Sequence, residues 1–278
     1  MNEPIHTEAG IAVVNEPFRI LSLDGGGAKG FYTLGVLTEI EAILKKPLCE
    51  HFDLIFGTST GAIIGALLAL GYRVGDVHAL YKTHVPAVMK ITNAHNKSKA
   101  LSRLCKSVFK ELTFSDVKTL VGIVATRWVL ERPMIFKSSP EQAHGRTSSF
   151  VPGFGFSIAD AVVASCSAYP FFDKVTLATS TGVETELIDG GYCANNPTLY
   201  AIAEALRALK RKPEDLRVIS VGVGQYPEPA HWGPKRWKTW AQKRLVSIQL
   251  LQKTLNVNTA SMEQLRSISF RRHSNREN

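Results

Sequence analysis

The chain has 278 residues, 45% of them hydrophobic, and a formal net charge of +9. This length and composition allow a substantial buried core. The four cysteines are scattered without a C-x-x-C pair, which argues against a zinc site or a disulfide framework and suits a reducing cytoplasm. The first residues carry acids and prolines, so we expect no signal peptide. The most apolar window, residues 62–70, is far too short to span a bilayer.

Apolar runs typical of strands alternate along the chain with patterns typical of helices. Strands are expected at residues 18–23, 52–56, 122–129, 184–188 and 216–223. Helices are expected at residues 31–44, 60–70, 157–167, 197–210 and 240–255. This alternation favours an α/β fold, in which a largely parallel sheet carries helices on both faces.

No linker rich in Ser, Gly or Pro divides the sequence, so we expect one domain. Residues 1–17 form an N-terminal extension to a domain of residues 18–278. The motifs of this domain fall at about 18–225, and its C-terminal part, residues 240–270, is expected to be helical. Residues 137–156 lack periodicity and are rich in Ser, Gly and Pro, which predicts a mobile loop in the role of a lid.

The segment FDLIFGTSTGAIIGALLALG contains the pattern G-x-S-x-G at Gly57–Gly61. A strand enters the pattern and an apolar helix leaves it, as in a nucleophile elbow, where a sharp turn lifts a serine hydroxyl out of the sheet edge. Ser59 is therefore the candidate nucleophile, with the positive end of a helix dipole beside it. The alternative is a structural turn in which Ser59 caps the helix.

A serine nucleophile needs a base to take its proton. Only His231 and His273 lie downstream of the late acidic candidates, and neither has surroundings that would position a base. Asp189, in the run LIDGG at the end of a strand, has two glycines that clear space before its carboxylate. The sequence thus suggests a Ser59–Asp189 dyad without a histidine. A turn residue at a strand end explains Asp189 equally well.

The run DGGGAKG at Asp24–Gly30 has two interpretations. The pattern G-x-G-x-x-G at Gly25–Gly30, after a strand and before a helix, matches a dinucleotide-binding loop. That interpretation needs an acid at the end of the next strand to hold a ribose, and Ser59 stands there instead. In the second interpretation, the backbone N–H groups of Gly26 and Gly27 form an oxyanion hole that faces Ser59. A non-catalytic or redox nucleotide-binding domain is therefore the alternative to a hydrolase.

Together, the motifs at Asp24–Gly30, Gly57–Gly61 and Asp189–Gly191 resemble those of the patatin-like phospholipase family. The runs ASCSAYP at Ala164–Pro170 and NNP at Asn195–Pro197 are similar to further motifs of that family. The resemblance implies a three-layer α/β/α fold with a mostly parallel central sheet. It also implies a serine acyl hydrolase of the phospholipase A type that acts on lipid esters.

The same resemblance assigns roles to individual residues. It implies Ser59 as the nucleophile and Asp189 as the proton acceptor. Gly26 and Gly27 would be the oxyanion donors, and Lys29 would occupy the family's basic position, where arginine is common. Chemistry of this kind requires no cofactor. The acidic and histidine residues of the sequence show no spacing typical of metal ligands, so no metal is expected.

The short N-terminus and the run FRILSLDGGGAKG are similar to cyclic-nucleotide-activated phospholipases of bacterial anti-phage systems. This similarity implies activation by a cyclic di- or trinucleotide and degradation of membrane phospholipid. It places the enzyme in the cytoplasm, acting peripherally at the inner membrane. No DNA or RNA polymer is expected as a partner. The sequence leaves open whether the chain forms a homo-oligomer.

Two basic regions, Lys97–Lys110 and Lys235–Arg244, carry part of the positive charge. The second region contains Trp237 and Trp240 among its cations, and tryptophan is typical of membrane interfaces. We interpret this mixture as a contact with a lipid surface. A solvated surface and the phosphates of a cyclic nucleotide are alternative explanations of the basic residues.

Overall fold

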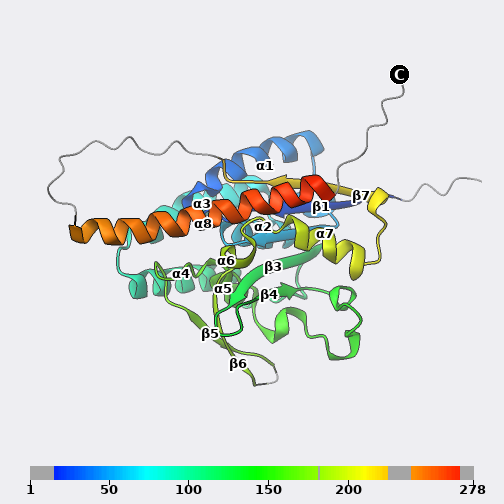
Figure 1. Cartoon of the computed structure of the whole chain (residues 1–278). Helices are drawn as coiled ribbons and strands as arrows, with labels where there is room; N and C mark the ends of the chain where they lie inside the picture. The colour runs from blue at the N-terminus through cyan, green and yellow to red at the C-terminus, as the bar shows by residue number, and fades with distance from the viewer. Residues whose placement is uncertain (1–15, 181, 225–238, 270–278) are drawn as a thin grey trace, which may run out of the picture.

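The computed structural model describes residues 16–180, 182–224 and 239–269 and has a mixed sheet at its centre (Figure 1). The strands follow the order β5-β6-β3-β2-β1-β7, and β4 also pairs with β3. Their bounds are β1 (Phe18–Leu23), β2 (Leu54–Thr58), β3 (Leu120–Arg127), β4 (Arg132–Lys137), β5 (Val175–Ala178), β6 (Glu184–Asp189) and β7 (Leu216–Val221).

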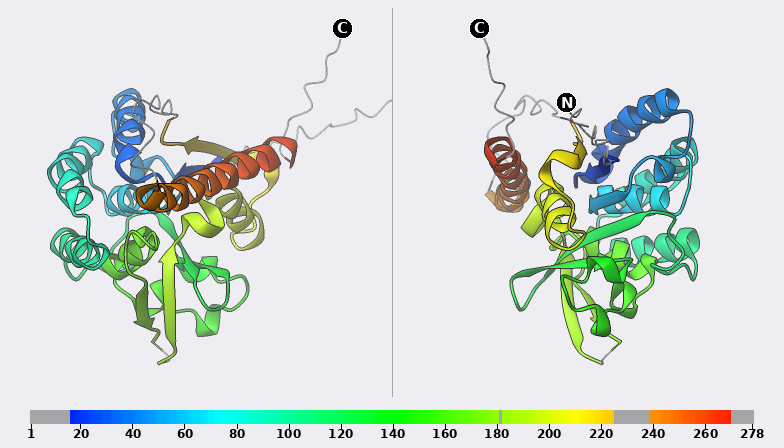
Figure 2. Two further views of the ribbon diagram at one scale, coloured as in Figure 1. Left: turned by 60° about the vertical axis from the view of Figure 1, so that its left-hand side comes forward. Right: turned by 90° about the vertical axis from the view of Figure 1, so that its right-hand side faces the viewer.

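Helices cover both faces of the sheet (Figure 2). One face carries α1 (Gly30–Leu44), α2 (Thr60–Ala69), α3 (Val74–Lys90), α4 (Ala94–Phe109) and α5 (Ile158–Cys166). The other face carries α6 (Gly191–Ala194) and α7 (Thr198–Arg207), and the long α8 (Thr239–Ser269) packs on these two. Short 3₁₀ turns lie at residues 27–29, 48–50, 140–142, 147–149, 152–155 and 213–215.

The alternation of side chains along the central strands explains why both faces are covered. In β1, Leu21 and Leu23 enter the core beneath α1 to α5, whereas Ile20 enters the smaller core beneath α6 and α7. In β2, Ile55 and Phe56 point to opposite cores in the same way. A strand buried on both faces needs this unbroken apolar run. The helix α2 is buried on nearly every side, as its composition predicted.

The α/β class with helices on both faces is confirmed, and the sheet is mixed. The strands β7, β1, β2 and β3 are parallel, whereas β4, β5 and β6 join by antiparallel pairing. All ten predicted elements are present with small shifts in their bounds, and α8 extends past the helix pattern at residues 240–255 to Ser269, within the C-terminal part 240–270 that was expected to be helical. The sequence analysis missed α3, α4, α6, β4 and β5.

The direction of β6 decides where the site forms. On one edge of β3, β2 pairs in parallel as far as the register Thr58 with Val124. The next residue of β3, Ala125, pairs with Asp189 at the end of the antiparallel β6. The carboxyl ends of β2 and β6 therefore meet head to head along one edge of β3.

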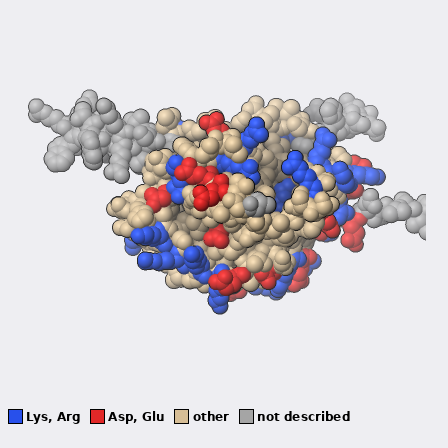
Figure 3. All heavy atoms as spheres, turned by 90° about the horizontal axis from the view of Figure 1, so that it is seen from below, with Lys and Arg blue, Asp and Glu red and all other residues tan. Residues whose placement is uncertain are grey.

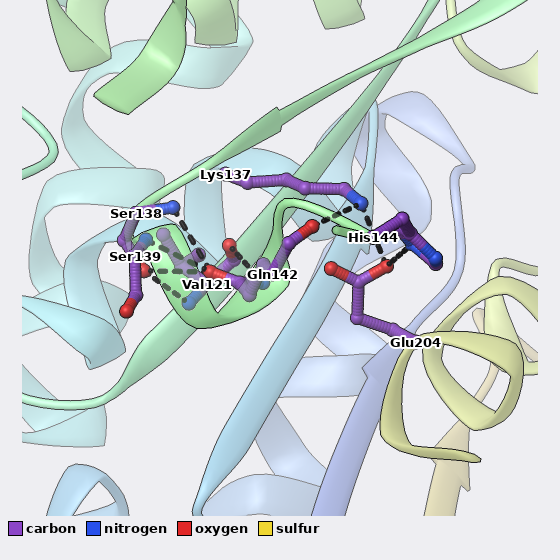
Figure 4. Close-up of polar contacts among 7 residues, drawn as sticks. All are labelled: Val121, Lys137, Ser138, Ser139, Gln142, His144 and Glu204. Carbon is purple, nitrogen blue, oxygen red and sulfur yellow. Dashed lines mark hydrogen bonds and ion pairs between the residues drawn. The ribbon is translucent and has the colours of Figure 1, made fainter. Parts of the chain in front are cut away.

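The segment 137–156 is anchored rather than mobile, so this prediction was wrong. The side chain of Gln142 is fully buried, and its polar contacts are drawn in Figure 4. Its Oε1 accepts hydrogen bonds from the backbone N–H groups of Ser138 and Ser139, each at 3.1 Å, and its Nε2 donates to Val121 O at 3.2 Å. A buried side chain that satisfies three backbone groups holds the segment in one conformation.

A buried ion pair joins the same segment to α7. Glu204 is 3% exposed, and its Oε2 lies 2.7 Å from Lys137 Nζ and 2.8 Å from His144 Nε2. The segment leaves β4 where Lys137 pairs with Gly122, near the start of β3. That is the amino-terminal edge of the parallel strands, opposite the edge at Ser59. The segment is therefore not a lid over Ser59.

Among the described residues, no single helix is long and apolar enough to cross a membrane. One helix pair, Thr147–Gly155 with Ile158–Cys166, passes a test of length and composition but is bent by 72°.

Replacing Gln142 tests the anchor. We expect Gln142→Ala to lower the free energy of unfolding by about 2–3 kcal/mol, because it leaves buried backbone groups without partners. Urea denaturation measures the change, with Glu141→Ala as the control at an exposed neighbouring position. A mobile loop would tolerate both substitutions equally, and that result would contradict the anchored segment.

Candidate active site

Ser59 lies in the sharp turn between β2 and α2, with a backbone φ of 53° and ψ of −119°. The two glycines of the motif permit this turn. A Cβ at residue 57 would lie 2.2 Å from Gly61 O, and one at residue 61 would lie 2.1 Å from Leu23 O. The motif is therefore required by close backbone contacts, and the hydroxyl of Ser59 stands at the N-terminus of α2.

The structure brings Ser59 and Asp189 together. Ser59 Oγ donates a hydrogen bond of 2.7 Å to Asp189 Oδ2, and Gly191 N–H donates one of 2.7 Å to Asp189 Oδ1. A Cβ at residue 190 would lie 2.1 Å from Val124 O, so the first glycine after the aspartate is required by the approach of β3. The run LIDGG thus places the carboxylate at the end of β6 and lets the chain turn into α6.

Burial shifts the acidity of Asp189. The residue is 4% exposed, and burial raises its pKa to about 6, while the hydrogen bonds from Ser59 and Gly191 oppose the rise. The carboxyl group is therefore mostly ionised at neutral pH. An ionised carboxylate that accepts a hydrogen bond from a serine hydroxyl can take its proton.

The glycine loop lies directly beside Ser59. A Cβ at residue 25 would lie 3.3 Å from Ser59 Cβ. The N–H of Gly25 donates to Asn195 O at 2.9 Å, whereas no hydrogen bond between described residues uses the N–H of Gly26 or Gly27. Two backbone N–H groups of the loop that begins beside Ser59 are therefore without a hydrogen-bond partner among the described residues, which an oxyanion hole requires.

Side chains from α2 and α3 hold this loop. Gly27 has a φ of +57°, and its carbonyl accepts hydrogen bonds from Thr60 Oγ1 at 2.7 Å and from the hydroxyl of Tyr81. The N–H of Lys29 donates a hydrogen bond to Gly26 O in the 3₁₀ turn at residues 27–29. Thr60, the residue after Ser59, therefore helps to hold the glycine loop beside Ser59.

Asp24 is a second buried carboxyl group, which the sequence analysis did not single out. It is 4% exposed, and burial, assisted by the negative charge of Glu263, raises its pKa to about 8. It is therefore mostly protonated at neutral pH. Asp24 is the first residue of the glycine loop. Because it is protonated, it adds no second negative charge beside the site.

The sequence analysis also missed the residues that support the site. Ser165 Oγ accepts a hydrogen bond of 2.9 Å from the N–H of Ser59 and donates one of 2.6 Å to Val124 O. Asn195 contacts both Gly25 and α8. Ser165 and Asn195 fall within motifs already quoted, but the α8 residues give no signal in the sequence.

No histidine among residues 16–180, 182–224 and 239–269 forms a hydrogen bond with Ser59 or Asp189. His231 and His273 lie outside these residues, as does Trp237, and the side chain of Trp240 is not described. The described part of the chain contains no group of three or more residues arranged to hold a metal ion.

Comparison with known proteins identifies the family. Residues 21–202 match the family model of the patatin-like phospholipases. The chain is 61% identical over 253 residues to a cUMP-AMP-activated phospholipase of Escherichia coli, covering 91% of this chain and 78% of the relative. It is 27% identical over 275 residues to a cGAMP-activated phospholipase of Escherichia coli strain TW11681, covering 89% and 75%.

One solved structure, VipD from Legionella pneumophila, matches 91% of this chain and 56% of its own chain at 14% identity, with a TM-score of 0.49. That likeness is too distant to bear on function. The family match and the relative at 61% identity show that the chain belongs to the patatin-like phospholipase family. It is a lipid acyl hydrolase, not a nucleotide-binding domain that lacks catalysis.

Proposed function

We propose that Ser59 is the nucleophile of this hydrolase and Asp189 its general base. The observation that carries the proposal is the 2.7 Å hydrogen bond from Ser59 Oγ to a buried carboxylate at the end of β6. Gly26 and Gly27 donate the N–H groups of the oxyanion hole. The turn at Ser59 directs the hydroxyl away from the sheet, and the N-terminus of α2 favours negative charge beside it.

The reaction proceeds through an acyl-enzyme. Asp189 takes the proton of Ser59 as the oxygen attacks the ester carbonyl, and the N–H groups of Gly26 and Gly27 bind the oxyanion that forms. Collapse of the intermediate breaks the ester bond, and Asp189 returns the proton to the departing alcohol. Water then attacks the acyl-enzyme while Asp189 accepts its proton, and Asp189 returns that proton to Ser59 Oγ as the acyl bond breaks and the fatty acid leaves.

The relatives support a more specific substrate and activator. Both are named as phospholipases activated by cyclic nucleotides, so we infer that this chain hydrolyses the acyl esters of membrane phospholipid in response to such a messenger. The relative at 61% identity favours cUMP-AMP over cGAMP. In this role the enzyme works from the cytoplasm at the inner membrane as an effector of anti-phage defence.

The pKa of Asp189 predicts the acid side of the pH profile. The base must be ionised to accept a proton, so kcat/KM for a soluble ester is expected to fall about tenfold per pH unit below about pH 6. A stopped ester assay from pH 4 to 8 measures this decline.

Asp189→Asn and Ser59→Ala should each reduce turnover of the same ester by at least about 10³-fold. Full activity of Asp189→Asn would contradict the role of the base.

The choice of activator is tested by measuring fatty-acid release from phospholipid vesicles. We expect cUMP-AMP to raise the rate at least about tenfold, and cGAMP to raise it less, because the chain is more similar to the cUMP-AMP-activated relative. Ser59→Ala with cUMP-AMP serves as the blank. Equal rates with and without cUMP-AMP would contradict activation by this messenger.

A further inference from the structure

An exposed apolar tip stands on the same edge of the sheet as Ser59. The hairpin of β3 and β4 turns at residues 128–131 and presents Trp128, Val129 and Leu130, which are 41%, 76% and 57% exposed. Because β3 is parallel to β2 and continues past the register with Thr58, this tip projects beyond the strand end that Ser59 follows. Three consecutive exposed apolar residues on a convex turn are unusual in a soluble protein.

The tip is held in a fixed orientation. The Trp128 ring lies 5.7 Å from the ring of Tyr169, and Lys174 Nζ lies 4.7 Å above Trp128. Lys174 is itself paired with Glu186 at 2.9 Å, and the N–H of Trp128 donates to Glu186 O. Tyr169 remains 39% exposed. An ordered tryptophan and tyrosine with exposed faces suit the boundary between lipid and water.

The tip connects to the site through a short stretch of backbone. The N–H groups of Tyr169 and Asp189 both donate to Ser167 O, at 2.9 and 3.0 Å. The hydroxyl of Tyr192 donates to Tyr169 O. A surface that binds at the tip therefore comes close to the residues that hold Asp189.

The N-terminal part of a basic helix, α4, packs against the residues that follow Tyr169. Asp173 N–H donates to Ser98 Oγ of α4 at 2.7 Å, and Lys97 Nζ lies 5.6 Å above the ring of Phe172. The exposed cations of α4 nearest to these contacts are Lys99 and Arg103, and Lys106 and Lys110 continue the exposed basic face toward the far end of the helix. Lys and Arg side chains gather at the lower left of Figure 3, on the side of the molecule where α4 lies in Figure 1. This basic face complements anionic headgroups.

We propose that residues 128–130 and Tyr169, with the basic face of α4, form the surface by which the enzyme docks on a glycerophospholipid bilayer containing anionic lipid. This inference rests on the proposed function, which requires the site to meet a membrane. The apolar tip enters the interface between headgroups and acyl chains, while the α4 cations remain among the headgroups. Docking in this orientation presents the Ser59 edge of the sheet to the lipid.

The test uses the inactive Ser59→Ala background, so that vesicles stay intact. Vesicles of phosphatidylethanolamine and phosphatidylglycerol are sedimented with the full chain. We expect Val129→Ser with Leu130→Ser to weaken binding about tenfold or more, because both side chains lose their burial in lipid. Ile43→Ser, at a 77% exposed position on α1, is the matched control and should bind normally. Salt should weaken the binding of every variant that binds.

A second arm separates docking from catalysis. In the active chain, assayed with cUMP-AMP present, the double variant should keep its turnover of a short soluble ester but lose about tenfold in vesicle hydrolysis. Wild-type vesicle binding by the double variant would overturn the proposal. A change of oligomeric state in that variant, with vesicle binding unchanged, would instead make the tip a contact between copies and also overturn it. Failure of the wild type to hydrolyse any ester would contradict the proposed function, not the docking surface.

A second inference rests on a different observation, the contacts between α8 and Asn195. Asn195 Nδ2 donates to Thr259 Oγ1 at 2.7 Å and to Gly25 O at 3.3 Å. The backbone N–H of Asn195 donates to Asn258 Oδ1 at 3.0 Å, and its carbonyl accepts the N–H of Gly25. Asn195 thus holds Gly25 through two hydrogen bonds, and it is itself held by the two hydrogen bonds that it donates to side chains of α8.

We infer that Thr259 is a positioning residue for the oxyanion loop. Its hydroxyl donates to Leu255 O at 3.0 Å and accepts from Asn195, so it fixes the direction of the Asn195 amide. The amide in turn fixes Gly25, which precedes the N–H groups of Gly26 and Gly27. This inference also rests on the proposed function. It makes α8 part of the catalytic unit, although α8 lies far from the motifs in sequence.

Three variants of α8 test this role. Thr259→Val removes the hydroxyl, and we expect kcat on a soluble ester to fall about tenfold with little change in KM, since loss of a whole oxyanion donor costs about 10²–10³. Thr259→Ser keeps the hydroxyl and should retain kcat. Thr254→Val is the matched control, because Thr254 also donates back along α8, to Leu250 O, without reaching Asn195. Wild-type kcat in Thr259→Val, or equal losses in the Val and Ser variants, would overturn the inference.

Discussion

The close approach of the β1 and β2 ends is the constraint on which the site depends. Where β2 turns into α2, Gly61 lies so near Leu23 O that a Cβ has no room, and Gly57 meets Gly61 in the same way. This crowding holds Ser59 at a positive φ and brings it beside Gly25 at the end of β1. The turn at Ser59 and the glycine loop are therefore held in place by the same set of close contacts.

Two buried carboxyl groups lie near these contacts, and their environments give them opposite states. Asp189 accepts hydrogen bonds from Ser59 and Gly191, which limit the effect of burial and leave its pKa at about 6. For Asp24, burial and then the negative charge of Glu263 raise the pKa to about 8, and Asp24 Oδ1 has no hydrogen-bond partner among the described residues. At neutral pH Asp189 is mostly ionised and Asp24 is mostly neutral, which leaves one negative charge beside the glycine loop.

The sequence was sufficient to predict the local elements of the site. Strand patterns and the glycine spacing predicted the turn at Ser59 and the loop before α1, because both depend on contacts between nearby residues. The direction of β6 was not predictable, since strand direction depends on pairing with β3 and not on local pattern. That direction is what brings Asp189 to Ser59.

Longer-range features were missed for the same reason. The segment 137–156 has the composition of a loop, but buried Gln142 and the Lys137–Glu204 ion pair fix it, and these contacts link residues far apart in the chain. The role of α8 could not be anticipated because Asn258 and Thr259 belong to no motif. Their partners, Cys193 and Asn195, lie more than 60 residues away.

The most direct test of the central claim is labelling with a fluorophosphonate probe, followed by mass spectrometry of the modified peptide. The account predicts a single adduct on Ser59 in the wild type with its cyclic-nucleotide activator, and loss of that adduct in Ser59→Ala. Slow labelling of the same residue is expected in Asp189→Asn, because the serine then lacks its base. An active enzyme that is labelled at another residue, or labelled equally fast in Asp189→Asn, would contradict the Ser59–Asp189 dyad.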